Sequence, residues 1–307
     1  MKHAYVFPGQ GAQAVGMGKD LYDNVPEAKA LFEQANEILG FRITDIMFAG
    51  TDEELKQTKV TQPAVFLHSV IMAKALGVKP DAVAGHSLGE FSALVVAGAL
   101  SFEDGLRLVS KRAMAMQKAC EAVPGTMAAI LGLDDAKVEE ACASIDGVVV
   151  AANYNCPGQL VIGGDKAAVD KAAELALAAG ARRCLPLNVS GPFHTSLMHP
   201  AGDALREKCK AVRFAPMQFP VLFNCLGHEM EETDTIAALL EKQVQSGVRW
   251  EMTVRRLAEL GVDAAIEIGP GRALTGFVKK TVGSAISCYP VETAAQLQQL
   301  LRTMKGA

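Results

Sequence analysis

GHSLGE, residues 85–90, places Ser87 between two glycines, directly after the apolar run 82–84 and before an apparently helical run, 88–100. The pattern predicts that a short strand turns sharply into a helix at this point. Glycines are needed on both sides because the turn is tight and a side chain there would clash with its neighbours. G-x-S-x-G in this setting is typical of a nucleophile elbow, which lifts the serine hydroxyl clear of the sheet. The alternative is a plain strand–helix turn that contains a serine.

A serine at such a corner needs a base to accept its proton. The downstream candidates are His194, in SGPFHT, and His199. His194 is favoured because it lies where the chain is expected to return from an inserted domain, and clefts form at such junctions. His86 adjoins the serine and is expected to shape the pocket. The orienting third member stays open among three acidic residues: Asp203, Glu267 and Glu90.

Two backbone segments are candidates for stabilising an oxyanion. The N–H of Leu88 is expected to lie free at the helix N-terminus, where it can donate to a negatively charged oxygen. The glycine loop FPGQGAQ, residues 7–13, follows a strand predicted over 3–7. It lacks the glycine spacing of a dinucleotide loop and the GK[ST] of a phosphate loop. It is therefore either a plain βα turn or a second part of an oxyanion hole, since both loops would lie at the carboxyl edge of one sheet.

Arg112 is predicted to lie on a helix over 102–120. A helical wheel gathers the apolar side chains of this helix into one stripe and places Arg112 at its edge, next to Met116. A guanidinium there is expected to be partly buried and to need a planar anionic partner. An internal Asp or Glu would serve, and a carboxylate on a substrate would serve equally well.

The order of predicted elements divides the chain. Residues 126–190 carry a β-α-β-β-α-β pattern, which is the split βαβ, ferredoxin-like order, and we expect 125–191 to form a compact inserted subdomain. In 1–124 and 192–307 helices and strands alternate, which predicts a mainly parallel sheet covered by helices on both faces. The predicted fold class is therefore α/β, with an α+β insert.

Composition argues against several classes of partner. The net charge of −4 disfavours a general nucleic-acid surface, which needs clustered Lys and Arg. The longest strongly apolar stretches are too short to span a bilayer, and the first residues lack the apolar core of a signal peptide. The seven cysteines are scattered without a CxxC pair and are expected to be free thiols, and no Cys/His cluster predicts a metal site. We therefore expect a cytoplasmic protein that binds neither nucleic acid nor membrane.

Five motifs occur along the chain in a characteristic order: FPGQGAQ, GHSLGE, RAMAMQ, SGPFHT and EIGPGRALTG. In order and approximate spacing they resemble those of malonyl-CoA:acyl carrier protein transacylases, and the resemblance runs through essentially the whole chain. It implies an α/β-hydrolase-like core with a ferredoxin-like insert. It also implies transfer of a malonyl group from malonyl-CoA to the phosphopantetheine thiol of acyl carrier protein, through a malonyl-serine intermediate and without a cofactor.

The resemblance implies roles for the matching residues. Ser87 is the nucleophile, and His194 is the general base and acid. A backbone carbonyl from a residue similar to Gln243, in KQVQSGVRW, orients the histidine in place of an acid. The backbone amides of Gln10 and Leu88 form the oxyanion hole.

The acyl pocket is also implied by the resemblance. Arg112 pairs with the free carboxylate of the malonyl group. Phe193 is similar to the bulky residue of malonyl-selective domains, although many relatives carry serine before the histidine. The other residues expected to line the pocket are Met116, Asn155 and His86.

Other functions remain open on sequence grounds. A serine thioesterase or hydrolase would use the same elbow with water as the acceptor, but Arg112 favours a charged acyl group. A non-catalytic adaptor for carrier proteins is opposed by the intact pair of Ser87 and His194. An acyltransferase of a polyketide pathway would use the same residues. The enzyme is expected to be a monomer, with four basic candidates for docking an acidic carrier: Lys279, Lys280, Arg182 and Arg183.

Overall fold

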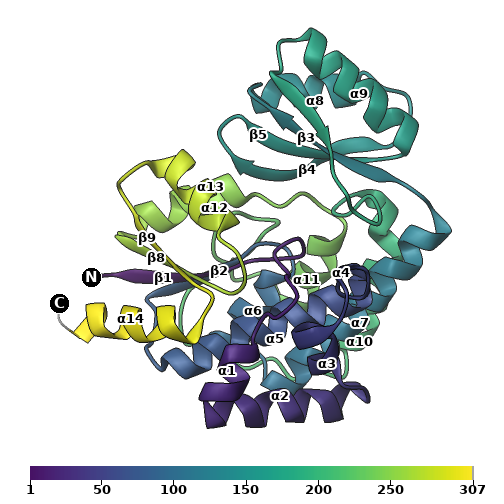
Figure 1. The fold of residues 1–307 in the computed structure, drawn as a ribbon. Coiled ribbons are helices and arrows are strands. Elements are labelled where there is room, and N and C mark those ends of the chain that lie inside the picture. Colours follow the sequence, from purple (N-terminus) through teal and green to yellow (C-terminus); the bar gives the residue numbers. More distant parts are fainter. Residues whose placement is uncertain (306–307) are drawn as a thin grey trace.

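The larger of two sheets is parallel throughout and forms the centre of the computed structural model, which describes residues 1–305 (Figure 1). Its strand order is β7-β2-β1-β8-β9, and each neighbouring pair is parallel. The strands are β1 (His3–Phe7), β2 (Ala82–Gly85), β7 (Val221–Leu222), β8 (Ala264–Ile268) and β9 (Ser287–Val291). The prediction of a mainly parallel sheet is confirmed.

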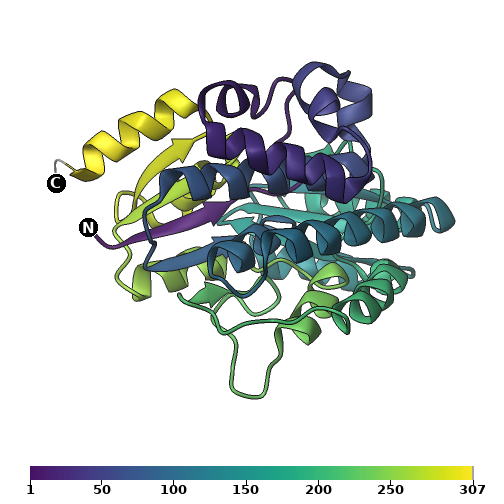
Figure 2. The same cartoon turned by 90° about the horizontal axis from the view of Figure 1, so that it is seen from below.

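Helices cover both faces of this sheet, and the side chains of β1, which point alternately to the two faces, are buried on both. Tyr5 and Phe7 belong to the larger apolar core beneath the sheet, whereas Ala4 and Val6 pack with Trp250 on the other side. Successive side chains of a strand point to opposite faces, so a strand that is buried on both sides is apolar at most positions, as β1 is from Ala4 to Phe7. Figures 1 and 2 show most helices gathered below the sheet, with α12 and α13 above it.

The helices have the following bounds: α1 (Lys19–Asn24), α2 (Pro26–Leu39), α3 (Ile43–Ala49), α4 (Asp52–Lys56), α5 (Thr58–Leu76), α6 (Gly89–Val96), α7 (Phe102–Ala122), α8 (Asp135–Ala143), α9 (Lys166–Ala178), α10 (His199–Cys209), α11 (Ile236–Val244), α12 (Trp250–Glu259), α13 (Ala273–Val282) and α14 (Ala294–Lys305). A short 3₁₀ turn, Ser196–Met198, precedes α10. The run 88–100 is not helical throughout: α6 ends at Val96 because the chain turns at Gly98, whose φ of 78° is left-handed.

The smaller sheet is antiparallel and lies apart from the first, capped by α8 and α9 (Figure 1). Its strand order is β4-β5-β3-β6. The strands are β3 (Thr126–Leu131), β4 (Val149–Cys156), β5 (Gln159–Gly164) and β6 (Arg183–Pro186). Strand β4 also connects to the rest of the molecule through a bridge between Asn153 and Val248. The smaller sheet therefore contacts the rest of the molecule at the segment that follows α11.

Local capping signals explain several helix starts. Thr51 and Glu54 form a reciprocal capping box on α4, and the Ser101 hydroxyl accepts from the Asp104 N–H at the start of α7.

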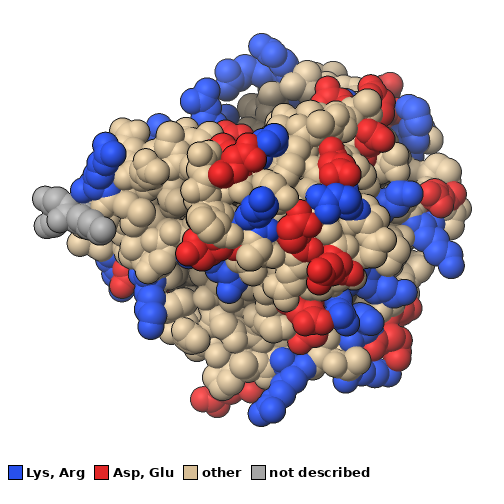
Figure 3. Space-filling view, turned by 60° about the horizontal axis from the view of Figure 1, so that its bottom comes forward, with Lys and Arg blue, Asp and Glu red and all other residues tan. Residues whose placement is uncertain are grey.

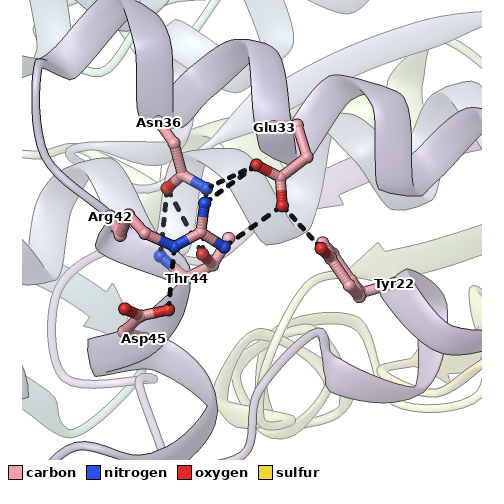
Figure 4. Close-up of polar contacts among 6 residues, drawn as sticks. All are labelled: Tyr22, Glu33, Asn36, Arg42, Thr44 and Asp45. Atoms are coloured by element: carbon pink, nitrogen blue, oxygen red, sulfur yellow. Dashed lines mark hydrogen bonds and ion pairs between the residues drawn. The ribbon is translucent and has the colours of Figure 1, made fainter.

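At the turn from α2 to α3, Arg42 donates to both Glu33 oxygens at 3.0 and 3.2 Å (Figure 4). Hydrogen bonds from Arg42 and then from the Tyr22 hydroxyl lower the pKa of Glu33 to about 2.

Charged side chains of both signs are intermixed on the face shown in Figure 3, over the part of the chain that is described. This agrees with the small net charge of −4. Within residues 1–305, no helix combines the length and the apolarity that a membrane span requires.

Candidate active site

The turn at Ser87 is as tight as its glycines predict. A Cβ added to Gly85 would lie 1.9 Å from the carbonyl carbon of Gly89, and one added to Gly89 would lie 2.1 Å from the Phe7 oxygen. Neither position tolerates a side chain. Ser87 itself has φ 52°, in the left-handed region that L-residues rarely adopt. The predicted strand–helix corner is confirmed, and it places the serine hydroxyl beyond the carboxyl end of β2.

His194 lies against the serine. Its Nε2 is 2.7 Å from Ser87 Oγ, and its Nδ1 is 2.8 Å from the backbone oxygen of Gln243 in α11. A carbonyl can only accept, so Nδ1 carries the proton and Nε2 is the acceptor. The serine O–H therefore donates to the histidine, which is the arrangement that a general base requires.

Burial keeps His194 neutral. Desolvation first, and then the positive charge of Arg112, lower the pKa of the imidazole to about 3. A histidine so far below its usual pKa does not hold a second proton near neutral pH. Its Nε2 lone pair therefore stays available to the serine.

The other candidates for base and orienting acid lie elsewhere. His199 is exposed and pairs with Gln245 and Asp203. Glu267 accepts the N–H groups at the start of α13, and Glu90 accepts the N–H of Asn224. None of the three acids contacts His194, since its Nδ1 is used by Gln243.

Arg112 is more deeply buried than the helical wheel predicts. Its side chain is 0% exposed, so the expectation of partial burial is wrong: Gln62 of α5, Gln243 of α11 and the Phe91 ring of α6 lie against the guanidinium. Nη1 donates to Gln62 Oε1 at 2.7 Å, and Nη2 donates to Gln243 Oε1 at 2.9 Å and to Ser87 Oγ at 3.2 Å. In residues 1–305, no Asp or Glu lies within ion-pair distance.

The charge state of Arg112 follows from this environment. Desolvation lowers its pKa to about 10, which the charge of Glu90 partly opposes. The guanidinium thus stays protonated near neutral pH. It is a buried cation held by neutral acceptors, and an anion that reached it would meet an unneutralised charge.

Asn224 is a site residue that the sequence did not reveal. Its Oδ1 accepts from the Ser87 N–H at 2.6 Å, and its Nδ2 donates to the Gly85 oxygen at 2.6 Å. Gln243 Nε2 donates to the Ser87 oxygen at 2.7 Å, so both peptide groups of the strained serine are held by side chains. Asn224 lies two residues beyond β7, at the carboxyl end of the strand next to β2. No motif surrounds Asn224, so its position at the end of a strand was the only feature that could have indicated a role in the site.

A cavity of about 410 Å³ opens beside Ser87 and His194, between the two sheets. The predicted residues that line it, besides that pair, are Gln10, His86, Met116, Asn155 and Phe193. His86 Nε2 is 2.8 Å from Asn155 Oδ1, which joins the serine corner to β4. Arg112, Leu88 and Gln243 do not line the cavity but lie behind its wall.

The glycine loop packs against the serine corner. A Cβ on Gly9 would lie 2.6 Å from the His86 oxygen, so the two backbones are in direct contact. Within the described chain, neither the Gln10 N–H nor the Leu88 N–H has a protein acceptor. Leu88 is fully buried, and an unpaired buried N–H is rare. Both amides are thus free to donate to a bound oxyanion.

The basic candidates for docking lie away from this cavity. Arg182, Arg183 and Lys280 line a separate cavity of about 490 Å³, where Lys280 donates to Gln159. Lys279 is the neighbour of Lys280 on α13 but does not line it. No group of three or more metal-binding side chains occurs in the part of the chain that the structure covers.

A strained serine at a strand–helix corner, hydrogen-bonded to a buried neutral histidine beside a cavity, defines a class of enzymes that form acyl-serine intermediates. The chain belongs to the acyl transferase family, whose model, described as an acyl transferase domain, matches residues 4–306.

Relatives cover almost the whole chain. A malonyl CoA-acyl carrier protein transacylase of Bacillus subtilis (strain 168) is 43% identical, covering 99% of this chain and 98% of the relative. A protein of the same name from Staphylococcus aureus (strain MRSA252) is 42% identical, covering 91% and 92%.

Solved structures agree with the fold. The MCAT of Streptococcus pneumoniae superposes with a TM-score of 0.93 at 44% identity, covering 98% of this chain and 100% of that one. A malonyl-transacylase in complex with its type II PKS acyl-carrier protein gives 0.94 at 40% identity, covering 99% and 100%. The mixed α/β fold with separate parallel and antiparallel sheets is confirmed.

Proposed function

We propose that this protein transfers the malonyl group of malonyl-CoA to the phosphopantetheine thiol of an acyl carrier protein. The observation that carries the proposal is the guanidinium of Arg112, whose Nη2 lies 3.2 Å from Ser87 Oγ. A buried cation beside the nucleophile selects an acyl group that ends in a carboxylate. The names of the relatives point to the same acyl group and the same acceptor.

Acylation begins when Ser87 Oγ attacks the thioester carbonyl. The hydroxyl proton passes to His194 Nε2 as the O–C bond forms, and the carbonyl oxygen becomes an oxyanion. The backbone N–H groups of Gln10 and Leu88 donate to that oxygen, and such a donor typically contributes ~3 kcal/mol. The C–S bond then breaks, and His194 gives its proton to the departing CoA thiolate. The product is a malonyl ester on Ser87.

Deacylation repeats these steps with a different nucleophile. The carrier's thiol gives its proton to His194 Nε2 and attacks the ester carbonyl. The same amides stabilise the second oxyanion. The C–O bond to Ser87 breaks, and His194 returns the proton to the serine. The backbone oxygen of Gln243 holds Nδ1–H through both halves, so the imidazole keeps one orientation.

The pocket residues have simpler roles in this proposal. Met116 and Phe193 supply apolar walls, and Phe193 limits the space beside the malonyl methylene, which disfavours a branched acyl group. Asn155 and His86 fix the opposite wall through their hydrogen bond.

The architecture of the two sheets supports a finer description. We propose that 1–124 and 192–307 form an α/β-hydrolase-like core and that 125–191 form a ferredoxin-like subdomain. The order β4-β5-β3-β6, with α8 and α9 packed together on one face, supports the second part. We further propose that the enzyme acts in the cytoplasm as a monomer. Its seven cysteines are free thiols, as a reducing compartment favours.

Intact-mass spectrometry tests the transfer. The protein is incubated with malonyl-CoA, and we expect a malonyl adduct that persists until a phosphopantetheinylated carrier is added. A hydrolase would lose the adduct rapidly to water, and an adaptor would form none. Either of these outcomes would contradict the proposed function.

Arg112→Ala should reverse the preference for malonyl over acetyl groups. Removing one partner of a buried charged contact typically costs ~3–5 kcal/mol, so malonyl transfer should fall by roughly 10²–10³. Acetyl transfer should be retained, because acetyl-CoA has no carboxylate to pair. The measurement is the ratio of the two kcat/KM values, together with the melting temperature.

Arg112→Lys is the matched control, since it keeps the charge but not the planar fork, and it should restore only part of the malonyl activity. An unchanged ratio with a lowered melting temperature in Arg112→Ala would show that the residue is structural.

A further inference from the structure

Arg112 does not face the cavity directly. Its side chain is 0% exposed, and the cavity beside Ser87 is lined instead by Gln62, from the first half of α5. The Gln62 carboxamide oxygen accepts a hydrogen bond from Arg112 Nη1 at 2.7 Å. On the Nη1 side, Gln62 therefore lies between the cavity and the guanidinium.

The two glutamines that hold Arg112 are not equivalent. Gln243 is fixed at both ends: its Oε1 accepts from Nη2 at 2.9 Å, and its Nε2 donates to the Ser87 oxygen at 2.7 Å. The amide nitrogen of Gln62 makes only long contacts, 3.3 Å to Gln10 Oε1 and 3.4 Å to Met116 Sδ. Gln62 is thus the partner of Arg112 that can turn away without disturbing the serine corner.

We propose that the Gln62 carboxamide oxygen occupies the position of one substrate carboxylate oxygen in the empty enzyme, and that Gln62 leaves Nη1 when the acyl group binds. This inference rests on the proposed malonyl transfer. Amide and carboxylate oxygens accept hydrogen bonds in similar geometry, but the amide is neutral. It satisfies a buried cation without an ion pair that the substrate would have to break. Gln62 is therefore a specificity-determining residue.

Gln62→Glu tests the requirement for a neutral side chain. A carboxylate at this position forms the buried ion pair with Arg112 and repels a second carboxylate. We expect kcat/KM for malonyl-CoA to fall at least ~100-fold, because like charges in a desolvated site repel strongly. Acetyl-CoA carries no such charge, and its rate should change by less than about threefold. Gln34→Glu, on the exposed face of α2, adds the same charge at the surface and should leave both rates unchanged.

Gln62→Ala separates displacement from orientation. If Gln62 is displaced by the substrate, its removal ends a competition, and the KM for malonyl-CoA should fall or stay unchanged. If Gln62 instead stays in place and orients Arg112, the KM should rise and the ratio of malonyl to acetyl transfer should fall, as in Arg112→Ala. The second outcome would overturn the inference.

The malonyl adduct of the wild type distinguishes failure of the proposed malonyl transfer from failure of the proposed role of Gln62. Absence of a malonyl adduct in the wild type refutes the malonyl transfer itself. A normal wild-type adduct, with a Gln62→Glu variant that keeps its malonyl preference, refutes only the role of Gln62. Melting temperatures show whether each variant folds. If Gln62→Glu does not fold, the KM of Gln62→Ala decides alone, because only the orienting role raises it.

Discussion

Ser87→Ala abolishes the malonyl adduct and leaves the fold intact: this is the largest effect that we expect. The substitution removes the atom that we propose carries the acyl group, Ser87 Oγ, and keeps the Cβ and the backbone. The corner is held by Asn224 and Gln243 through the backbone of residue 87, not through the hydroxyl. Intact-mass spectrometry after incubation with malonyl-CoA measures the adduct, and circular dichroism measures the fold.

Ser190 provides the matched control for this result. It is a second serine hydroxyl near the site, 2.9 Å from Thr58 Oγ1, and Thr58 in turn contacts the Gln10 side chain. Ser190→Ala should acylate at the wild-type rate. An adduct that survives in Ser87→Ala and disappears in Ser190→Ala would move the nucleophile to the other residue.

His194→Ala should slow acylation by roughly 10²–10⁴, the usual contribution of a positioned general base. Without the imidazole, Ser87 Oγ has no acceptor for its proton at 2.7 Å. The measurement is the single-turnover rate of adduct formation. His199→Ala is the control, since His199 is exposed and contacts Gln245, and its rate should match the wild type.

The dependence of the wild-type acylation rate on pH also tests the assignment of His194 as the general base. Because burial and Arg112 lower the pKa of His194 to about 3, the base stays deprotonated well below the usual histidine range. Acidification from pH 8 to 5 should therefore leave His194 unprotonated, and the acylation rate should not fall through protonation of this residue. A fall centred near pH 6.5, the ordinary histidine value, would indicate a solvated base and contradict the buried pair.

Local features of the chain could be predicted because their causes are local. The corner at Ser87 follows from two glycines, and the starts of α4 and α7 follow from side chains that cap the adjacent N–H groups. The β-α-β-β-α-β order likewise appeared in the sequence as the elements of the smaller sheet. The capping atoms, and Gly85 with Gly89, lie within a few residues of one another, whereas the close approach of Gly89 to Phe7 depends on a distant strand.

Features that depend on distant parts of the chain were predicted incompletely. The burial of Arg112 depends on α5, α6 and α11, and its two glutamine acceptors, Gln62 and Gln243, lie 50 and 131 positions away in the sequence. Asn224 is 137 positions from Ser87 and carries no motif. The contact between Gln243 and His194 is predicted by the family resemblance and not by the spacing of residues. Every residue has a backbone carbonyl, so the residue type at position 243 does not indicate that its carbonyl orients a histidine.

The backbone angles at positions 87 and 194 have an evolutionary consequence. Among residues 1–305, Ser87 and His194 are the only non-glycine residues with positive φ, at 52° and 58°. An L-residue in this region costs roughly 1–2 kcal/mol that glycine does not incur. While activity is selected, this cost is maintained. In a lineage released from that selection, substitution toward glycine at these two positions relieves strain and is not opposed, so pseudo-enzymes of this fold should lose the reacting pair early and for reasons of stability.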